Sequence, residues 1–145
     1  MEKLPHVYEV KVSAENGGHL SASGVGLPTL LCAPPIQFGG PGDQWSPEGL
    51  LMAAVTNCLV LSFRAIAAAS RFEWLTIECD ASGVLDQVDR KIQITTIENR
   101  VWLVVPAGSD VIKAEKLLEK AEQTCFISNS LTAEVNLNCV ITVAD

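Results

Sequence analysis

The sequence has few basic residues, which excludes the class of proteins that bind nucleic acid. Its 145 residues hold 10 Lys and Arg against 17 Asp and Glu, so the net charge is -7. The isoelectric point is about 4.7. Because phosphate binding needs a surplus of positive charge on one face, we instead expect a soluble protein whose partners are small molecules or other proteins.

The chain also lacks the segments that direct a protein into or through a membrane. Its first ten residues, MEKLPHVYEV, contain no basic segment followed by an apolar run, so we expect no signal peptide. The longest apolar run is broken by Asn57 and Arg64, short of the roughly 20 residues that a membrane span needs. We therefore expect a cytoplasmic protein that does not associate with membranes.

No cysteine cluster or CxxC pair is present. The five cysteines are an odd number spread along the chain, and the two histidines, His6 and His19, lie far from them in sequence. This pattern does not fit the disulfide framework of a secreted protein. It also argues against a structural zinc site. We expect neither a metal nor a cofactor.

No repeat, low-complexity run or polar linker divides the chain, whose 145 residues are the size of one ordinary domain. We therefore predict a single domain over residues 1–145. Hydrophobic residues make up 48% of the chain and charged residues 19%. This composition is apolar enough to suggest that a second copy covers part of the surface, so a homodimer is expected.

The N-terminal third of the sequence is typical of strands and a loop. Residues 7–14 alternate apolar and polar side chains, ENGGH at 15–19 supplies a turn, and residues 20–33 are again strand-like. The segment PPIQFGGPGDQWS, residues 34–46, is too rich in proline and glycine to continue a helix or a central strand. It is predicted to be a loop, and long ordered loops often carry function.

A long helix is predicted from Pro47 to about Ser70. Ser46 can cap its first amides, proline suits the first helical position, and Glu48 faces the positive end of the helix dipole. The middle of the helix, LLMAAVTNCLVLSF, is apolar on nearly every side. A helix tolerates this only when it is enclosed all round, so we place it in the centre of the molecule or of a dimer.

The C-terminal half predicts an antiparallel hairpin followed by helix and strand. Residues 74–85 and 91–106 alternate at period two, with DQVDR as the connecting turn. The remaining predicted elements are a helix capped by Asp110 with apolar residues between 111 and 121, a short helix in FISNSL, and a closing strand over 133–143. This order predicts an α+β fold of antiparallel strands and helices.

Two cysteines stand out by position. Cys58 lies on the buried helix, where a thiol could open onto a pocket at a subunit interface. Cys125 lies where one helix stops and another starts, and amides at a helix N-terminus can lower the pKa of a thiol, with Ser128 as a polar neighbour. The other three lie in strand-like runs, where a small apolar side chain needs no functional explanation: Cys32, Cys79 and Cys139.

The segments SPEGLLMAAVTNC, Ser46 to Cys58, and KAEQTCFIS, Lys120 to Ser128, together resemble the OsmC/Ohr family of thiol-dependent hydroperoxide reductases (osmotically inducible protein C-like, organic hydroperoxide resistance). Two predicted strands separate them, and the resemblance covers nearly the whole chain in element order. It implies an OsmC-like α+β fold with antiparallel sheets wrapped around a central buried helix. It also implies an intertwined homodimer with an active site at the interface.

By the same resemblance, Cys58 is the peroxidatic thiol, Cys125 the resolving thiol and Glu48 the glutamate that supports the site. A thiolate attacks the organic hydroperoxide, becomes a sulfenic acid and condenses with the second thiol to a disulfide. An external dithiol must then reduce that disulfide. The resemblance thus implies a peroxidase in oxidative-stress defence, and the apolar surroundings of Cys58 favour organic hydroperoxides over hydrogen peroxide.

One part of the family pattern is absent from this chain. In the family, an arginine ahead of the buried helix is held by the glutamate and stabilises the thiolate, but the first arginine here is Arg64. Gln37 lies near where one branch of the family carries its arginine, and His19 is the best local candidate for a replacement cation.

Three interpretations therefore stay open. The first is a peroxidase with a different activating group. The second is a non-catalytic OsmC-like dimer that binds a small hydrophobic ligand or senses oxidation. In the third, both cysteines serve only for packing.

Overall fold

The longest apolar stretch of the chain forms one continuous helix, α1 (Pro47–Ala69). Its end lies one residue before the predicted end at Ser70. The N-terminus is capped as expected, because Ser46 Oγ accepts a hydrogen bond from the backbone N–H of Gly49 at 3.0 Å. The local signals of cap, proline and first-turn carboxylate therefore confirm the predicted helix start.

Near the start of this helix, contacts divide the chain into two units. In the computed structural model, which describes residues 2–145, one unit ends at Leu51 and the other is Met52–Asp145. The sequence predicts a single domain because no linker interrupts it. The division into two contact units falls within the continuous helix α1, where no linker composition marks it.

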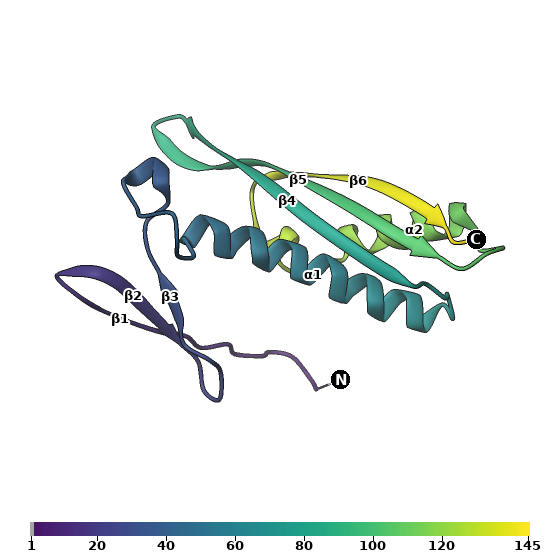
Figure 1. Cartoon of the computed structure of the whole chain (residues 1–145), viewed down its shortest axis with the longest axis horizontal. Coiled ribbons are helices and arrows are strands. Elements are labelled where there is room, and N and C mark those ends of the chain that lie inside the picture. Colours follow the sequence, from purple (N-terminus) through teal and green to yellow (C-terminus); the bar gives the residue numbers. More distant parts are fainter. Residues whose placement is uncertain (1) are drawn as a thin grey trace. The chain divides into compact units, whose positions relative to one another are not determined.

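The first unit contains a three-stranded antiparallel sheet in the order β1-β2-β3 (Figure 1). Its strands are β1 (Lys11–Glu15), β2 (Gly17–Ser23) and β3 (Leu30–Cys32). The predicted hairpin is confirmed, although its turn is tighter than expected because Glu15 already pairs with Gly17. Gly17 has a φ of 128°, which favours glycine. The predicted loop contains only one short 3₁₀ turn, η1 (Ile36–Phe38).

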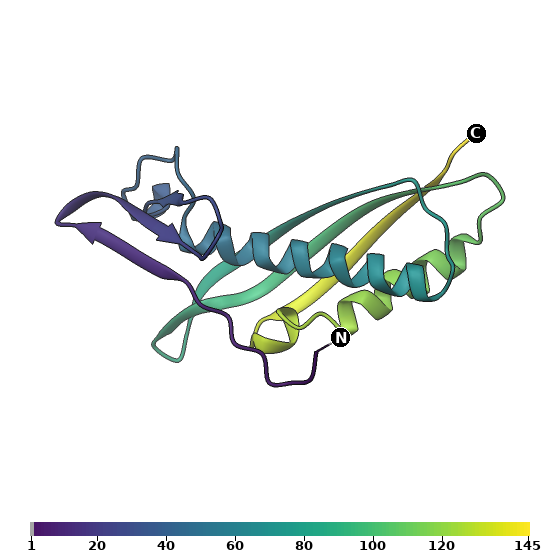
Figure 2. The ribbon, with the colours of Figure 1, turned by 90° about the horizontal axis from the view of Figure 1, so that it is seen from below.

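The second unit is a sheet with two helices packed on one face, as Figures 1 and 2 show. Its elements are β4 (Thr76–Val88), β5 (Lys91–Val105), α2 (Val111–Gln123) and β6 (Glu134–Val143). The turn between β4 and β5 is Asp89 and Arg90, both at positive φ, so it is shorter than the predicted DQVDR. Asp110 caps α2 as predicted, accepting from the N–H of Lys113 at 3.0 Å.

Strand β6 pairs with β5 in parallel, which corrects the prediction of purely antiparallel sheets. A parallel pair needs a crossover connection, and α2 supplies it by returning the chain to the end from which β5 started. The predicted short helix after Cys125 is a single 3₁₀ turn, η2 (Ser128–Ser130). The predicted α+β class is confirmed.

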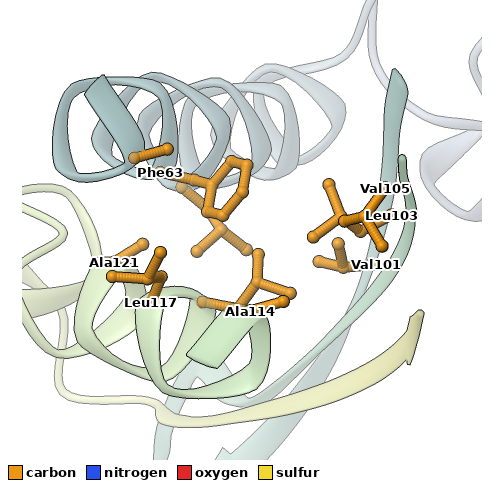
Figure 3. Packing of buried hydrophobic residues seen from close by; sticks show 10 residues of the cluster. Phe63, Val101, Leu103, Val105, Ala114, Leu117 and Ala121 are labelled. Atoms are coloured by element: carbon orange, nitrogen blue, oxygen red, sulfur yellow. The ribbon is translucent and has the colours of Figure 1, made fainter. Parts of the chain in front are cut away.

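The core of the second unit lies between the two helices and β5 (Figure 3). The ring of Phe63 meets the ring of Trp74 edge-on, with centroids 5.7 Å apart. The other buried members are Leu59 and Ala67 from α1, Val101, Leu103 and Val105 from β5, and Ala114, Leu117, Leu118 and Ala121 from α2. This core holds α1 against α2 and so determines where Cys58 can lie.

Helix α1 buries only one stripe within a single chain. Its fully buried residues recur at every fourth position, whereas Leu61 is 58% exposed. The sequence predicts a helix enclosed on all sides, in the centre of the molecule or of a dimer, whereas a single chain leaves part of α1 exposed. Contrary to expectation, α1 is also long and apolar enough to cross a membrane, with a mean hydropathy of 1.8 over its most apolar window. Core helices of soluble proteins meet the same criterion.

Candidate functional site

Two cysteine thiols, those of Cys58 and Cys125, lie side by side within the second unit. Each thiol interacts with the other closely enough to shift its pKa, and neither is in a disulfide. Cys58 lies on α1 and is partly exposed, whereas Cys125 follows the end of α2 and is fully buried. The tertiary structure thus brings together the two cysteines that the sequence singles out.

The chain turns tightly after α2, and this turn directs several N–H groups toward the thiols. The N–H of Cys125 donates to the carbonyl of Glu122 at 3.1 Å, and the N–H of Asn129 donates to the carbonyl of Cys125 at 3.0 Å. Between them, the N–H of Ser128 donates to Cys125 Sγ at 3.5 Å. The N–H groups at the start of such a turn have no helical partner and are free to interact with sulfur.

The pKa of the Cys58 thiol is lowered from its ordinary value. Burial is the largest single influence and acts to raise this pKa. The backbone N–H of Ile127, the Cys125 thiol, the N–H of Phe126 and the Ser62 hydroxyl together outweigh burial. Because these donors favour the anion, Cys58 is the more readily ionised thiol of the pair.

The pKa of the Cys125 thiol is raised, which corrects the expectation that helix-terminal amides would lower it. Burial is the main cause, and proximity to Cys58 raises the pKa further. The hydroxyl and N–H of Ser128 lower it, but not enough to offset burial. The turn's other amides, those of Phe126 and Ile127, act on Cys58 instead. Cys125 therefore stays protonated while Cys58 ionises.

Within residues 2–145, no cationic side chain contributes to the lowered pKa of Cys58. Arg64 is exposed on α1 and is not among the groups that act on the Cys58 thiol. His19 on β2 and Gln37 on η1 are exposed residues of the first unit. Backbone N–H groups, a thiol and a hydroxyl are thus the groups that stabilise this thiolate.

Glu48 belongs to the first unit, where it lines a pocket of about 380 Å³ together with Pro34, Pro35 and Phe38. One of its carboxylate oxygens, Oε2, is buried and has no hydrogen-bond partner among the described residues. His19 lines a different hollow, along the β1–β2 hairpin. The structure therefore does not pair the glutamate with the histidine that the sequence offers as a replacement cation.

The sequence interpretation missed Ser62, whose hydroxyl acts on the Cys58 thiol, and two further polar residues, Asn99 and Glu122, which hydrogen-bond to each other. Asn99 is fully buried on β5, and its Nδ2 donates to Glu122 Oε2 at 3.3 Å. The sequence pattern of β5 does indicate Asn99. This residue lies two positions before Val101, so its side chain is on the same inward-facing side of the strand. A polar side chain at an inward position of an otherwise apolar strand indicates a specific hydrogen-bonding role.

The remaining cysteines occupy packing positions, as the sequence predicts. Cys79 on β4 and Cys139 on β6 flank Val101 in register and pack against the core. Burial, with a smaller effect of the Asp80 carboxylate, raises the pKa of Cys79 to about 11. Burial, with smaller effects of Glu115 and Glu119, raises the pKa of Cys139 to about 11. Thiols with such pKa values are poor nucleophiles at neutral pH.

The pH dependence of alkylation should separate Cys58 from the other thiols. Because the thiolate reacts and the pKa of Cys58 is lowered, we expect iodoacetamide to modify Cys58 at a lower pH than the same thiol in denatured protein. Ser62→Ala removes one donor, so it should slow alkylation at pH 7 about two- to tenfold. Peptide mass spectrometry measures both rates.

The matched control for this experiment is Ser82→Ala, which removes an exposed hydroxyl on β4. We expect it to leave the alkylation rate of Cys58 unchanged. A Ser62→Ala variant that alkylates at or above the wild-type rate would contradict the assigned role of the hydroxyl.

Comparison with curated proteins finds relatives of low identity along most of the chain. An organic hydroperoxide resistance protein of Xanthomonas axonopodis pv. citri is 26% identical over 141 residues, which cover 97% of this chain and 96% of the relative. Peroxiredoxin OsmC of Escherichia coli is 30% identical over 93 residues, 64% of each chain. An uncharacterised protein of Bacillus subtilis is 26% identical over 106 residues, 71% of each chain.

Solved structures share the fold. An OsmC-like protein of unknown function from Vibrio cholerae has a TM-score of 0.87 at 21% identity, covering 94% of this chain and all of the other. An organic hydroperoxide resistance protein from Legionella pneumophila has a TM-score of 0.69 at 24% identity, covering 97% of this chain. The family model described as OsmC-like protein matches residues 40–140, which include both thiols of the site. The chain therefore belongs to the OsmC-like protein family.

Proposed function

We propose that this protein is a thiol-dependent peroxidase that reduces organic hydroperoxides through Cys58 and Cys125. The observation that carries the proposal is that two adjacent thiols have opposite pKa shifts, with that of Cys58 lowered and that of Cys125 raised. The printed names of the Xanthomonas and Escherichia coli relatives support this class of activity. Family membership supports it as well.

In the first step, the Cys58 thiolate attacks one peroxide oxygen. An S–O bond forms and the O–O bond breaks, so the sulfur is oxidised to a sulfenic acid and the peroxide is reduced to an alkoxide, which takes a proton from water to leave as the alcohol. Cys58 suits this role because it is the partly exposed, more readily ionised thiol.

In the second step, Cys125 attacks the sulfur of the Cys58 sulfenic acid. The S–S bond forms, the S–O bond breaks and water is released. Cys125 suits this role because it is fully buried beside Cys58 and protected from direct oxidation. An external dithiol would then return two electrons to the disulfide, in keeping with a reducing cytoplasmic location.

Activation of Cys58 by the amides of Phe126 and Ile127 would replace the family's arginine. Amide N–H groups stabilise an anion without a formal charge. Two exposed apolar side chains next to the site, Leu61 and Phe126, favour an organic substrate over hydrogen peroxide.

A second candidate function is a non-catalytic OsmC-like protein that binds a small hydrophobic ligand or senses oxidation. It is favoured by the lack of any cationic contribution to the Cys58 pKa within residues 2–145. It gains further support from the partly apolar pocket of about 380 Å³ beside Glu48. This alternative predicts thiols that react with peroxides no faster than free cysteine does.

Stopped-flow oxidation of the reduced protein distinguishes the two functions. We expect the protein to react with cumene hydroperoxide far faster than free cysteine does. We also expect it to react faster with cumene hydroperoxide than with hydrogen peroxide. Peptide mass spectrometry should then identify a Cys58–Cys125 disulfide. Reaction at the rate of free cysteine, or a disulfide that omits either residue, would favour the binding function.

We also propose that the protein is a homodimer in which a second copy covers the exposed apolar side of α1. Because an apolar helix surface is unfavourable in water, Leu61→Asp should weaken dimerisation about a hundredfold or more. Sedimentation velocity over a dilution series measures the change.

The matched control is Ile112→Asp, which places the same charge at an exposed apolar position of α2. We expect it to leave association unchanged. A wild-type protein that sediments as a monomer, or equal effects of the two variants, would contradict this interface.

A further inference from the structure

The carboxylate of Glu122 lies near the Ser128 hydroxyl, which in turn neighbours the Cys125 thiol, and the peroxide step does not use this carboxylate. Glu122 is half-buried in the last turn of α2, three residues before Cys125. Its Oε2 accepts a hydrogen bond from Nδ2 of Asn99 at 3.3 Å. Asn99 itself is fully buried, and its Oδ1 has no partner among the described residues. Burying these polar groups costs free energy, so packing alone does not explain them.

The hydroxyl of Ser128 lies near both Glu122 and Cys125. It is close enough to lower the pKa of each, after the larger opposing effect of burial. Ser128 is only 7% exposed, and its Oγ makes no hydrogen bond of good geometry within residues 2–145. Its N–H already fixes the residue against Cys125 Sγ at 3.5 Å. A serine hydroxyl rotates freely and can accept one proton while donating another.

The groups that face Glu122 suit a proton acceptor. Burial raises the pKa of Glu122, with weaker opposing effects from Ser128 and Asn99. The other titratable group that faces it is the Cys79 thiol on β4, whose pKa is about 11 and which is therefore neutral at physiological pH. A carboxylate of raised pKa is a stronger base than an exposed one, and no cation among the described residues opposes its protonation.

We propose that Glu122 accepts the proton of Cys125 through the Ser128 hydroxyl when the disulfide forms. This inference rests on the proposed peroxidase function and extends it to the resolving step. As Cys125 sulfur attacks the Cys58 sulfenic acid, its proton passes to Ser128 Oγ while the Ser128 proton passes to Glu122. The S–S bond forms, the S–O bond breaks, and the departing hydroxide takes a proton from the solvent to become water. Ser128 contacts the reacting thiol, and Glu122 is a positioning residue that acts through it.

The test is single-turnover oxidation of Glu122→Gln by cumene hydroperoxide, with the sulfenic acid trapped by dimedone at successive times. We expect sulfenic acid to form at the wild-type rate and the disulfide to close at least about tenfold more slowly at pH 7. Ser128→Ala should show the same defect. Glu119→Gln, which removes an exposed carboxylate from the same helix, is the matched control and should close normally.

The pH profile of disulfide closure separates a proton acceptor from a merely structural residue. In wild type, closure should quicken as Glu122 ionises on the acid side. In Glu122→Gln this rise should vanish, leaving only an increase at alkaline pH where Cys125 ionises by itself, and Glu122→Asp should restore the acid-side rise in part.

Two results would overturn this inference alone: wild-type closure in both Glu122→Gln and Ser128→Ala, or slow closure with the acid-side rise intact. Wild-type protein that forms no sulfenic acid would instead overturn the peroxidase function, and the inference with it. Circular dichroism shows whether each variant folds. If Glu122→Gln does not, Ser128→Ala decides the outcome.

Discussion

Replacing Cys58 with serine is expected to lower the rate of reaction with cumene hydroperoxide by about a thousandfold or more. A serine hydroxyl does not ionise near neutral pH, so the amides that stabilise the Cys58 thiolate have no anion to act on. Cys125 remains, but its buried thiol with a raised pKa cannot substitute. Stopped-flow measurement of thiol loss gives the rate.

The companion variant Cys125→Ser should behave differently, because it removes the resolving thiol and keeps the attacking one. We expect it to react with peroxide and to stop at a sulfenic acid that dimedone traps. Cys139→Ser, at a packing position with a pKa of about 11, is the control and should keep the wild-type rate. Equal loss in all three variants, or none in Cys58→Ser, would show that the assignment of the nucleophile is wrong.

The largest effect on stability is expected from Phe63→Ala, which should lower the free energy of unfolding by about 3–5 kcal/mol. Phe63 is fully buried at the contact of α1 with α2 and β5, and its ring meets that of Trp74. Truncation removes this apolar contact and leaves a cavity between the helices. Urea denaturation followed by circular dichroism measures the loss.

An exposed apolar residue provides the comparison for this prediction. Ile112 on α2 is 65% exposed, so Ile112→Ala should change the free energy of unfolding by no more than about 0.5 kcal/mol. A loss below 1 kcal/mol for Phe63→Ala would mean that the core can collapse around the missing ring. That result would contradict a close-packed junction at Phe63.

The sequence predicts the two long helices and the β1–β2 hairpin well because their signals act over a few residues. Ser46 and Asp110 mark the two helix starts, and each cap forms the hydrogen bond that its side chain predicts. Glycines at positive φ likewise mark the β1–β2 turn. The parallel pairing of β6 has no such local signal, since it depends on the route that the chain takes through α2.

By itself, the sequence determined which two cysteines are candidates, because their positions on an apolar helix and after a helix end can be identified from neighbouring residues. Only the tertiary structure decided that Cys58 has the lowered pKa and Cys125 the raised one. It also decided that Asn99 and Ser128 lie beside Glu122. The physical reason is that a pKa depends on burial and on donors brought close by folding, and residues distant in the chain supply both.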